Sequence, residues 1–521
     1  MMDNAALMDQ IAAADLSEEA RAVAVEVARV LEQPEAAAAE SFQAHEYLEN
    51  LLALPWAEPG PPPSADPEAI AAEVDIGQYA PPFNRRLLVD WMLSAHRAES
   101  PGAALLCGPP GGGRRSLARR VAAALDLPAA TIDLVGTAGE SDVLGAGSSQ
   151  TRGAIGSLAR ALAAIGNRRG VIVLANVQWA VANWPDRGAR LLALLDDVEA
   201  RRNWRDQYLD VGFDLTSTLF VLTADGSGAL PPEIIDRMLL VDCPGYTRSE
   251  RSRIVQTHLW EEIKARYDIT SPVALGEDAA EALVTEYTPE AGLAATSIAL
   301  SEMARRVAAA PDGSAPPLID AAGLSLMLGK PRRYYRDEAG YARPGACRTL
   351  LLGPHGSSVQ LVEAVPVPGG RYYLTPEGTS APVNKACDTA YYYVRSRMTE
   401  LDISARQLFE YGYKINHNLG ASDHDAETLS LAVLVSLISA LRDRPIDPET
   451  AVVGEMNQNG VLMGGPGLAH RLLAAQRAGI RRILLPRANA PDIEELPPGL
   501  ESDLTLVMVS DADQAIRVAL S

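Results

Sequence analysis

The sequence has few of the residues that cross-link, anchor or target a chain. Its four cysteines, Cys107, Cys243, Cys347 and Cys387, lie far apart and form no CxxC pair, so neither a disulfide framework nor a zinc site is indicated. It contains no run of 18 apolar residues, so no transmembrane helix is predicted. Met1–Asn4 lacks the basic and apolar regions of a signal peptide. We therefore expect a cytoplasmic protein with no metal and no membrane partner.

Basic residues are also scarce. The 46 Lys and Arg residues are outnumbered by 67 Asp and Glu residues, which gives a net charge of −21. Because phosphate contacts require a basic surface, we do not expect a nucleic-acid partner. The remaining composition, 47% hydrophobic and 22% charged, is that of a folded protein, and 521 residues suggest three or four domains.

Hydrophobic periodicity divides the chain into segments. Helical spacing over residues 5–33 and 36–54 predicts an N-terminal helical arm, and the proline cluster Glu58–Pro63 predicts a stiff linker. Between residues 76 and 245, short apolar runs alternate with helical patterns, which predicts a parallel α/β sheet. The predicted strands are Ala103–Cys107, Ala130–Leu134, Gly170–Leu174 and Thr218–Thr223.

The C-terminal half changes pattern twice. Residues 247–328 are helical in pattern throughout, which predicts a small helical domain. Residues 331–521 predict an α+β domain, with a hairpin over Val359–Leu374, a helix over 382–400 and a strongly apolar helix over Glu427–Leu441.

A phosphate-binding loop without its reactive side chains follows the first strand. Gly108–Ser116 reads GPPGGGRRS and precedes a helical stretch, as a P-loop requires. Gly111 and Gly113 keep the turn, and backbone N–H groups at a helix N-terminus can hold an anion. Hydrolysis also needs Lys on the phosphates and Ser or Thr on Mg²⁺. Arg114 and Arg115 occupy those positions, so we expect the loop to be kept and ATP hydrolysis to be lost.

The order of these segments resembles the Lon family of ATP-dependent AAA+ proteases without their N-terminal substrate domain. The resemblance implies a multidomain protein with a helical arm (1–57), a Pro-rich linker (58–75), a degenerate AAA+ α/β domain (76–246), an AAA+ helical subdomain (247–330) and an α+β Lon protease-like domain (331–521). The motifs that carry it are Glu46–Trp56, Tyr208–Leu215, Gly245–Thr247, Glu286–Gly292, Tyr393–Arg397, Gly454–Glu455 and Leu472–Ile480.

The resemblance also implies that residues needed for ATP hydrolysis in the family have been replaced in this chain. The two family carboxylates after the third strand are replaced by Ala175 and Asn176, which leaves no ligand for hydrated Mg²⁺ and no group to polarise the attacking water. The family's sensor Asn corresponds to Asp225, which would repel a γ-phosphate, and its second-sensor Arg corresponds to Ala294. Arg237 keeps the place of an arginine finger, which we interpret as an interface ion pair left from ring packing.

The cleavage centre has changed as well. Lon-type cleavage uses a Ser hydroxyl activated by a buried Lys. Thr428 stands at the Ser position, and Asp425 keeps its place nearby. The Lys position is Arg471, and a guanidinium cannot be deprotonated to accept the hydroxyl proton. Glu455 keeps a family Gly-Glu pair, either to orient the centre or as a satisfied carboxylate.

A replacement base stays open at this point. Lys414, His417 and His424 are near Thr428 in sequence, and His470 adjoins the lost base. Lys414 on a neighbouring strand could form a rewired Thr–Lys pair, whereas His470 is interpreted as a surface or interface histidine.

Together these features predict a ring-forming, hexameric Lon-like protein without ATPase or peptidase activity. It would act as a scaffold that binds unfolded polypeptide or a partner protein, and it would need no cofactor. Two alternatives stay open. One is an ATP-independent peptidase that uses Thr428 with a non-standard base, and the other is a regulatory subunit of an active Lon-type protease.

Overall fold

A computed structural model describes most of the chain: residues 4–31, 38–60, 66–75, 82–95, 102–147, 153–226, 230–288, 290–309, 316–331, 342–353, 356–368, 373–376, 379–417, 425–494, 496, 500 and 503–521. The chain divides into two compact units. The first contains the N-terminal helices, Phe83–Cys107 and Gly113–Cys243, and the second contains Gly108–Gly112 and Pro244–Ser521.

The first unit is built on a five-stranded parallel sheet with the order β2-β3-β6-β1-β7. The four predicted strands are confirmed, each within one residue of its predicted bounds, whereas β7 was not singled out from the sequence. The strands are β1 (Ala103–Cys107), β2 (Ala129–Asp133), β3 (Val171–Ala175), β6 (Leu219–Ala224) and β7 (Leu239–Asp242), beside the antiparallel pair β4 (Trp204–Arg205) and β5 (Gly212–Phe213).

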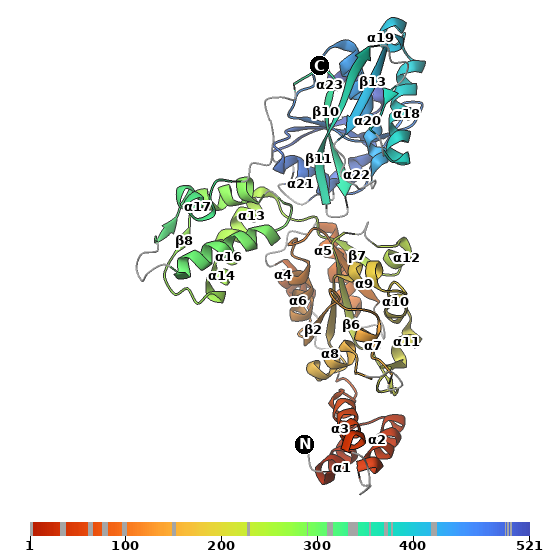
Figure 1. Cartoon of the computed structure of the whole chain (residues 1–521), viewed down its shortest axis with the longest axis vertical. Coiled ribbons are helices and arrows are strands. Elements are labelled where there is room, and N and C mark those ends of the chain that lie inside the picture. The colour runs from red at the N-terminus through yellow and green to blue at the C-terminus, as the bar shows by residue number, and fades with distance from the viewer. Residues whose placement is uncertain are drawn as a thin grey trace. The chain divides into compact units, whose positions relative to one another are not determined.

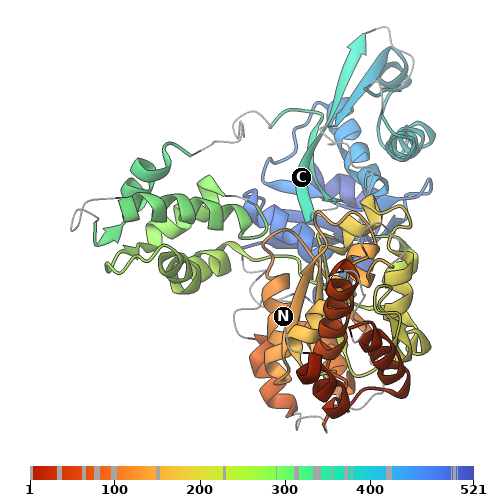
Figure 2. The same cartoon turned by 60° about the horizontal axis from the view of Figure 1, so that its bottom comes forward.

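Helices cover both faces of this sheet (Figures 1 and 2). Strands buried on both faces are apolar throughout instead of alternating, which explains the continuous runs in the sequence. Along β1, Ala103, Leu105 and Cys107 enter one core, and Ala104 and Leu106 enter the other. The helices are α4 (Pro67–Asp75, within the predicted linker), α5 (Pro82–Ala95), α6 (Arg114–Ala124), α7 (Ser141–Leu144), α8 (Ser157–Ile165), α9 (Val177–Asn183), α10 (Ala189–Asp196), α11 (Val198–Arg202) and α12 (Pro232–Ile235).

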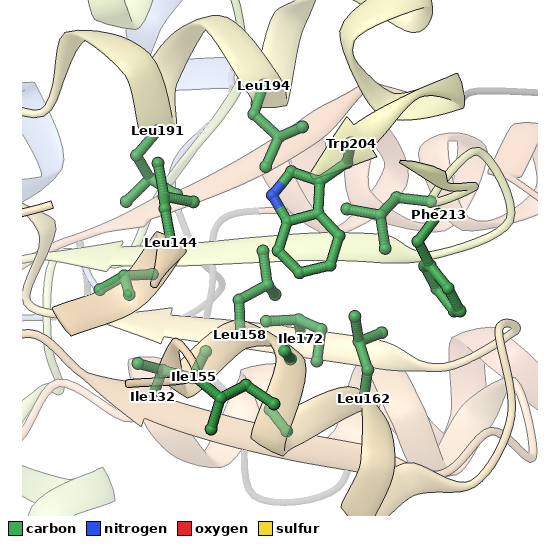
Figure 3. Close-up of a cluster of buried hydrophobic side chains, with 14 of the residues drawn as sticks. Ile132, Leu144, Ile155, Leu158, Leu162, Ile172, Leu191, Leu194, Trp204 and Phe213 are labelled. Carbon is green, nitrogen blue, oxygen red and sulfur yellow. The ribbon is translucent and has the colours of Figure 1, made fainter. Parts of the chain in front are cut away.

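The N-terminal helices α1 (Asn4–Ala13), α2 (Glu18–Leu31) and α3 (Ala38–Ala53) share a core with one face of the sheet. The Tyr47 hydroxyl donates a hydrogen bond to the Leu209 carbonyl at 2.6 Å. The Trp56 ring meets the Phe213 ring edge to face, with centroids 5.2 Å apart. Phe213 also packs beside Trp204 in the cluster shown in Figure 3. Two of the sequence motifs, 46–56 and 208–215, thus hold the helical arm in place.

The segment that follows β7 is almost wholly helical, as predicted (green in Figures 1 and 2). Its first helix begins with a reciprocal capping box between Thr247 and Glu250. The helices are α13 (Arg248–Ile254), α14 (Trp260–Arg266), α15 (Glu277–Ala282), α16 (Ala294–Ala309) and α17 (Ala321–Leu328), with π-helical turns at Val255–Leu259 and Leu283–Tyr287 and a strand pair β8 (Ala274–Leu275) and β9 (Leu318–Ile319).

The C-terminal domain contains a mixed seven-stranded sheet with the order β12-β13-β11-β10-β14-β17-β18. Its strands are β10 (Ala346–Gly353), β11 (Gly356–Pro368), β12 (Tyr373–Leu374), β13 (Tyr411–His417), β14 (Thr450–Val452), β17 (Arg482–Pro486) and β18 (Thr505–Val509), with a separate pair β15 (Glu455–Met456) and β16 (Leu462–Met463). Its helices are α18 (Ala381–Ser396), α19 (Ala405–Phe409), α20 (Leu429–Arg442), α21 (Leu468–Arg477), α22 (Ala490–Glu494) and α23 (Ala512–Ala519), with 3₁₀ turns at Ala426–Thr428 and Arg487–Asn489.

The hairpin predicted over Val359–Leu374 was wrong in its placement. The antiparallel hairpin is formed by β10 and β11, and β12 instead pairs in parallel with β13. Most of β10 is buried and none of its residues is fully exposed, so it lacks the alternation that marks a half-exposed strand. All four cysteines are buried free thiols. Among the helices in the described part of the chain, none is long and apolar enough to cross a membrane.

Candidate functional site

Thr428 lies at the start of the apolar helix α20, where the sequence placed it. A 3₁₀ turn over Ala426–Thr428 precedes the helix, and Asp425 enters that turn in the left-handed region with φ of 70°. Thr428 is only 3% exposed. Its hydroxyl donates a hydrogen bond to the Asp425 carbonyl oxygen at 2.9 Å. The hydroxyl proton is therefore directed at a backbone acceptor, which cannot serve as a base.

Arg471 lies on α21 and is 1% exposed. Its Nη2 is 2.6 Å from Oδ2 of Asp425, and its Nε donates to the Pro466 carbonyl at 3.1 Å. Its Nη1 donates to the carbonyl of Leu350 in β10. Burial lowers the pKa of Arg471, and the Asp425 carboxylate opposes that shift. The guanidinium is thus a buried cation held by one carboxylate and two carbonyls.

Gly465 lies beside the side chains of both Thr428 and Arg471. A Cβ atom at Gly465 would lie 3.1 Å from both Nη2 of Arg471 and Cγ2 of Thr428, so a larger residue there would have to displace these side chains by a few tenths of an ångström. Asn489 is buried and donates to the Gly465 carbonyl at 2.9 Å, which fixes this loop over the site. Asn489 was missed from the sequence, because an isolated Asn carries no signal of such a role.

Three carboxylates gather at the edge of this centre. Glu455 lies on β15, and burial raises its pKa, with further contributions from the negative charges of Glu427 and Asp425. Lys385 lies 3.7 Å from Glu427 in an exposed pair and partly offsets this effect. In the described part of the chain, no cluster of His, Cys, Asp or Glu has the arrangement of a metal site.

Of the four candidate replacement bases, the structure describes the side chains of Lys414 and His470. Lys414 is exposed on β13, where it pairs with Val365 of β11. The prediction that His470 is a surface or interface residue was wrong: it is 9% exposed, because α21 packs on β10 and β11, and its Nδ1 faces Gly356. His424 lies outside the described residues, and so does the side chain of His417.

The glycine-rich loop is the second candidate site. Arg114 begins α6, and its side chain is 9% exposed. Its Nη2 is 2.5 Å from Oδ1 of Asp225, which follows β6. Asp225, predicted from the sequence to repel phosphate, is thus the counterion of Arg114. Arg237 is exposed in the turn after α12.

Arg115 and Asn176, two other residues singled out from the sequence, both bind Asp133. Arg115 donates to Oδ2 of Asp133 at 2.9 Å, and Asn176 donates to Oδ1 of the same carboxylate at 2.7 Å. Ala175 ends β3 without a carboxylate. Hydrated Mg²⁺ and the phosphates of a nucleotide need free cations and a metal-binding carboxylate. These residues therefore do not fit MgATP.

In the second unit, the glycine-rich loop packs tightly against the start of α16. Leu293 N–H donates to the Gly111 carbonyl at 3.0 Å. A Cβ atom at Gly111 would lie 2.3 Å from the backbone nitrogen of Ala294, and one at Gly292 would lie 2.0 Å from the Pro110 carbonyl oxygen. The glycines are therefore required by close backbone packing, and Gly113 closes the loop as the N-cap of α6 with φ of 86°.

The C-terminal domain is thus an α/β domain that brings together Thr428, Asp425 and Arg471, the residues singled out from the sequence. Residues 318–521 match the family model of the Lon protease (S16) C-terminal proteolytic domain. The chain is 30% identical to Lon protease of Salinispora arenicola across 98% of its own length and 67% of that relative. It is 30% identical to Lon protease 4 of Sorangium cellulosum across 99% of its own length, and 28% identical to Lon protease 1 of Thermus thermophilus across 98%.

The chain therefore belongs to the Lon protease family, which confirms the resemblance inferred from its motifs. It spans about 65% of the length of the Sorangium and Thermus relatives.

Proposed function

We propose that this chain is a Lon-family protein without ATPase or peptidase activity, and that it acts as a scaffold that binds unfolded polypeptide or a partner protein. The observation that carries the proposal is the buried ion pair between Arg471 and Asp425. A general base must accept the proton of the attacking hydroxyl. A guanidinium cannot do so, and the Thr428 hydroxyl is already hydrogen-bonded to a carbonyl.

The glycine-rich loop supports the loss of the motor independently. Arg114 is bound to Asp225, and Asn176 and Arg115 share Asp133. Nucleotide hydrolysis requires Mg²⁺ and a group that orients the attacking water, and neither Ala175 nor Asn176 can supply a carboxylate. A ring, most simply a hexamer, follows from the family resemblance, and it would keep a chamber for binding.

The proposal is tested by incubating the purified full chain with an unfolded casein substrate, with and without ATP and Mg²⁺, while phosphate release is measured in parallel. We expect neither cleavage nor nucleotide-dependent phosphate release above the level of a Thr428→Ala/Arg114→Ala variant. Casein cleavage that Thr428→Ala abolishes would favour the ATP-independent peptidase instead. Phosphate release that Arg114→Ala abolishes would show that the motor is active.

Binding must then be demonstrated, because a lack of catalysis alone does not define a scaffold. Fluorescence anisotropy of labelled unfolded casein should rise on addition of the chain, to the same extent with and without ATP. If the casein does not bind but the chain co-purifies in a mixed ring with an active Lon-type subunit, the regulatory-subunit alternative is supported and the self-contained scaffold is rejected.

A further inference from the structure

The N-terminus of α6 is the place where a phosphate-binding loop holds its anion, and in this chain a carboxylate is bound to its first residue. The helix is 11 residues long and begins at Arg114, and its N-cap Gly113 has no side chain to satisfy the free N–H groups. The partial positive charge of a helix N-terminus favours an anion. Asp225 supplies a carboxylate oxygen 2.5 Å from Nη2 of Arg114.

We propose that Asp225 is an internal substitute for phosphate, which blocks the N-terminus of α6 against free phosphate and nucleotide. This inference rests on the proposed loss of nucleotide hydrolysis and explains how the buried Arg114 is kept without a ligand. The N-terminus of α6 would then serve the fold alone, with the charge of Arg114 neutralised from within the chain.

The burial of Arg114 makes a counterion necessary. An ionised side chain removed from water is strongly destabilising unless it is paired, and the Arg114 side chain is 9% exposed. Asp225 satisfies only part of it, because Nη1 of Arg114 is buried and has no hydrogen-bond partner within the described structure. A phosphate group can accept from both nitrogens of one guanidinium. The arginine therefore retains an unused donor that an incoming phosphate would satisfy once Asp225 is removed.

The neighbouring pair does not have the same role. The side chains of Arg115 and Asp133 are 61% and 46% exposed, and exposed ion pairs contribute little to stability because water screens them. Asp133 also accepts from the Asn176 amide and the Val135 N–H, so it is held largely by groups other than Arg115. The role of internal phosphate substitute is thus assigned to Asp225.

The test is the binding of inorganic pyrophosphate and of ADP, without Mg²⁺, to the full chain by isothermal titration. The wild type should show no saturable binding at millimolar ligand. Asp225→Asn removes the charge, keeps the size of the side chain and restores the residue type of the family's sensor. It should bind pyrophosphate with an apparent Kd at least tenfold lower than that of the wild type. The double variant Asp225→Asn/Arg114→Ala should lose this gain.

A matched control removes the same charge elsewhere. Asp210→Asn alters a carboxylate that is 83% exposed, and it should leave pyrophosphate binding at the wild-type level. Asp225→Glu keeps a carboxylate and should also fail to bind. If Asp225→Asn melts early, pyrophosphate should raise its Tm, and that shift provides the same test.

Three results would overturn the inference: wild-type binding as tight as that of Asp225→Asn, no gain in Asp225→Asn by titration and by melting, or a gain that Arg114→Ala leaves intact. None of these assays measures hydrolysis. A failure here therefore leaves the proposed function standing, whereas ATP hydrolysis by the wild type would refute that proposal separately.

Discussion

Removing the charge of Asp425 should destabilise the C-terminal domain more than any surface substitution. Asp425 adopts φ of 70°, a conformation that Asn tolerates and Ala does not, so Asp425→Asn is the cleanest perturbation. The amide oxygen of Asn can still accept the hydrogen bond from Leu352 N–H, which Asp425 accepts at 2.9 Å. What is lost is the charge opposite Arg471.

The size of the effect follows from burial. The side chains of Arg471 and Asp425 are 1% and 7% exposed. Breaking a buried pair from one side costs about 3–5 kcal/mol, because the remaining charge stays uncompensated. For a domain of roughly 200 residues, this corresponds to a fall in Tm of about 6–20 °C. The comparison is Glu427→Gln, which removes the same charge from a pair exposed at 74% and 55% and should cost at most about 1 kcal/mol.

Differential scanning calorimetry is the suitable assay, because all six tryptophans lie between Trp56 and Trp260 and cannot report on the C-terminal domain. Only the transition of that domain should move. Adding Arg471→Met to Asp425→Asn should recover part of the loss, since it removes the orphaned charge. Equal melting of Asp425→Asn and Glu427→Gln would refute the view that this pair is a buried structural link.

Two further predictions concern the same domain. Gly460 and Gly479 both have positive φ, but a Cβ atom at Gly460 would lie 2.5 Å from the Tyr393 ring, whereas Gly479 faces open space. In urea denaturation, Gly460→Ala should therefore lower the free energy of unfolding by about 1–3 kcal/mol more than Gly479→Ala does. Equal losses would show that backbone strain alone matters at both positions. Burial and nearby negative charge raise the pKa of Glu455 in the folded chain. As pH rises, the Glu455 carboxyl therefore ionises in the unfolded chain before it does so in the folded chain. The contribution of Glu455 to the free energy of unfolding is complete below the ordinary carboxyl pKa and is lost as pH rises through the raised pKa. The Tm of Glu455→Gln should therefore rise relative to that of the wild type as pH increases above about 4, the ordinary carboxyl pKa, and a difference in Tm that does not change with pH would contradict the shift.

The parallel sheet was predictable because its strands are short runs buried on both faces, bounded by turn residues, and such runs stand out in the sequence. The pairing of the charged residues was not. Arg114 and Asp225 are 111 positions apart, and the sequence identified each only as a substitution at a family position. Their contact depends on β1 and β6 being neighbours in the sheet, because Arg114 begins the helix after β1 and Asp225 follows β6.

At the candidate site around Thr428, the contacts between residues were likewise not predictable from the sequence. The sequence located Thr428, Asp425 and Arg471 by their place in family motifs. It could not reveal that Arg471 turns towards Asp425 and the carbonyl of Leu350, because that depends on α21 packing beside β10. The buried position of His470 was mispredicted for the same reason, since a polar residue beside an arginine suggests a surface.

The central claim is that no group accepts the proton of Thr428. Cleavage of a short fluorogenic peptide tests it most directly, because such a substrate needs no unfolding and thus no motor. The wild type and Thr428→Ala should give the same background rate over the neutral to alkaline range. A wild-type rate well above background that Thr428→Ala removes would contradict the account, because a working base would then have to stand beside that hydroxyl.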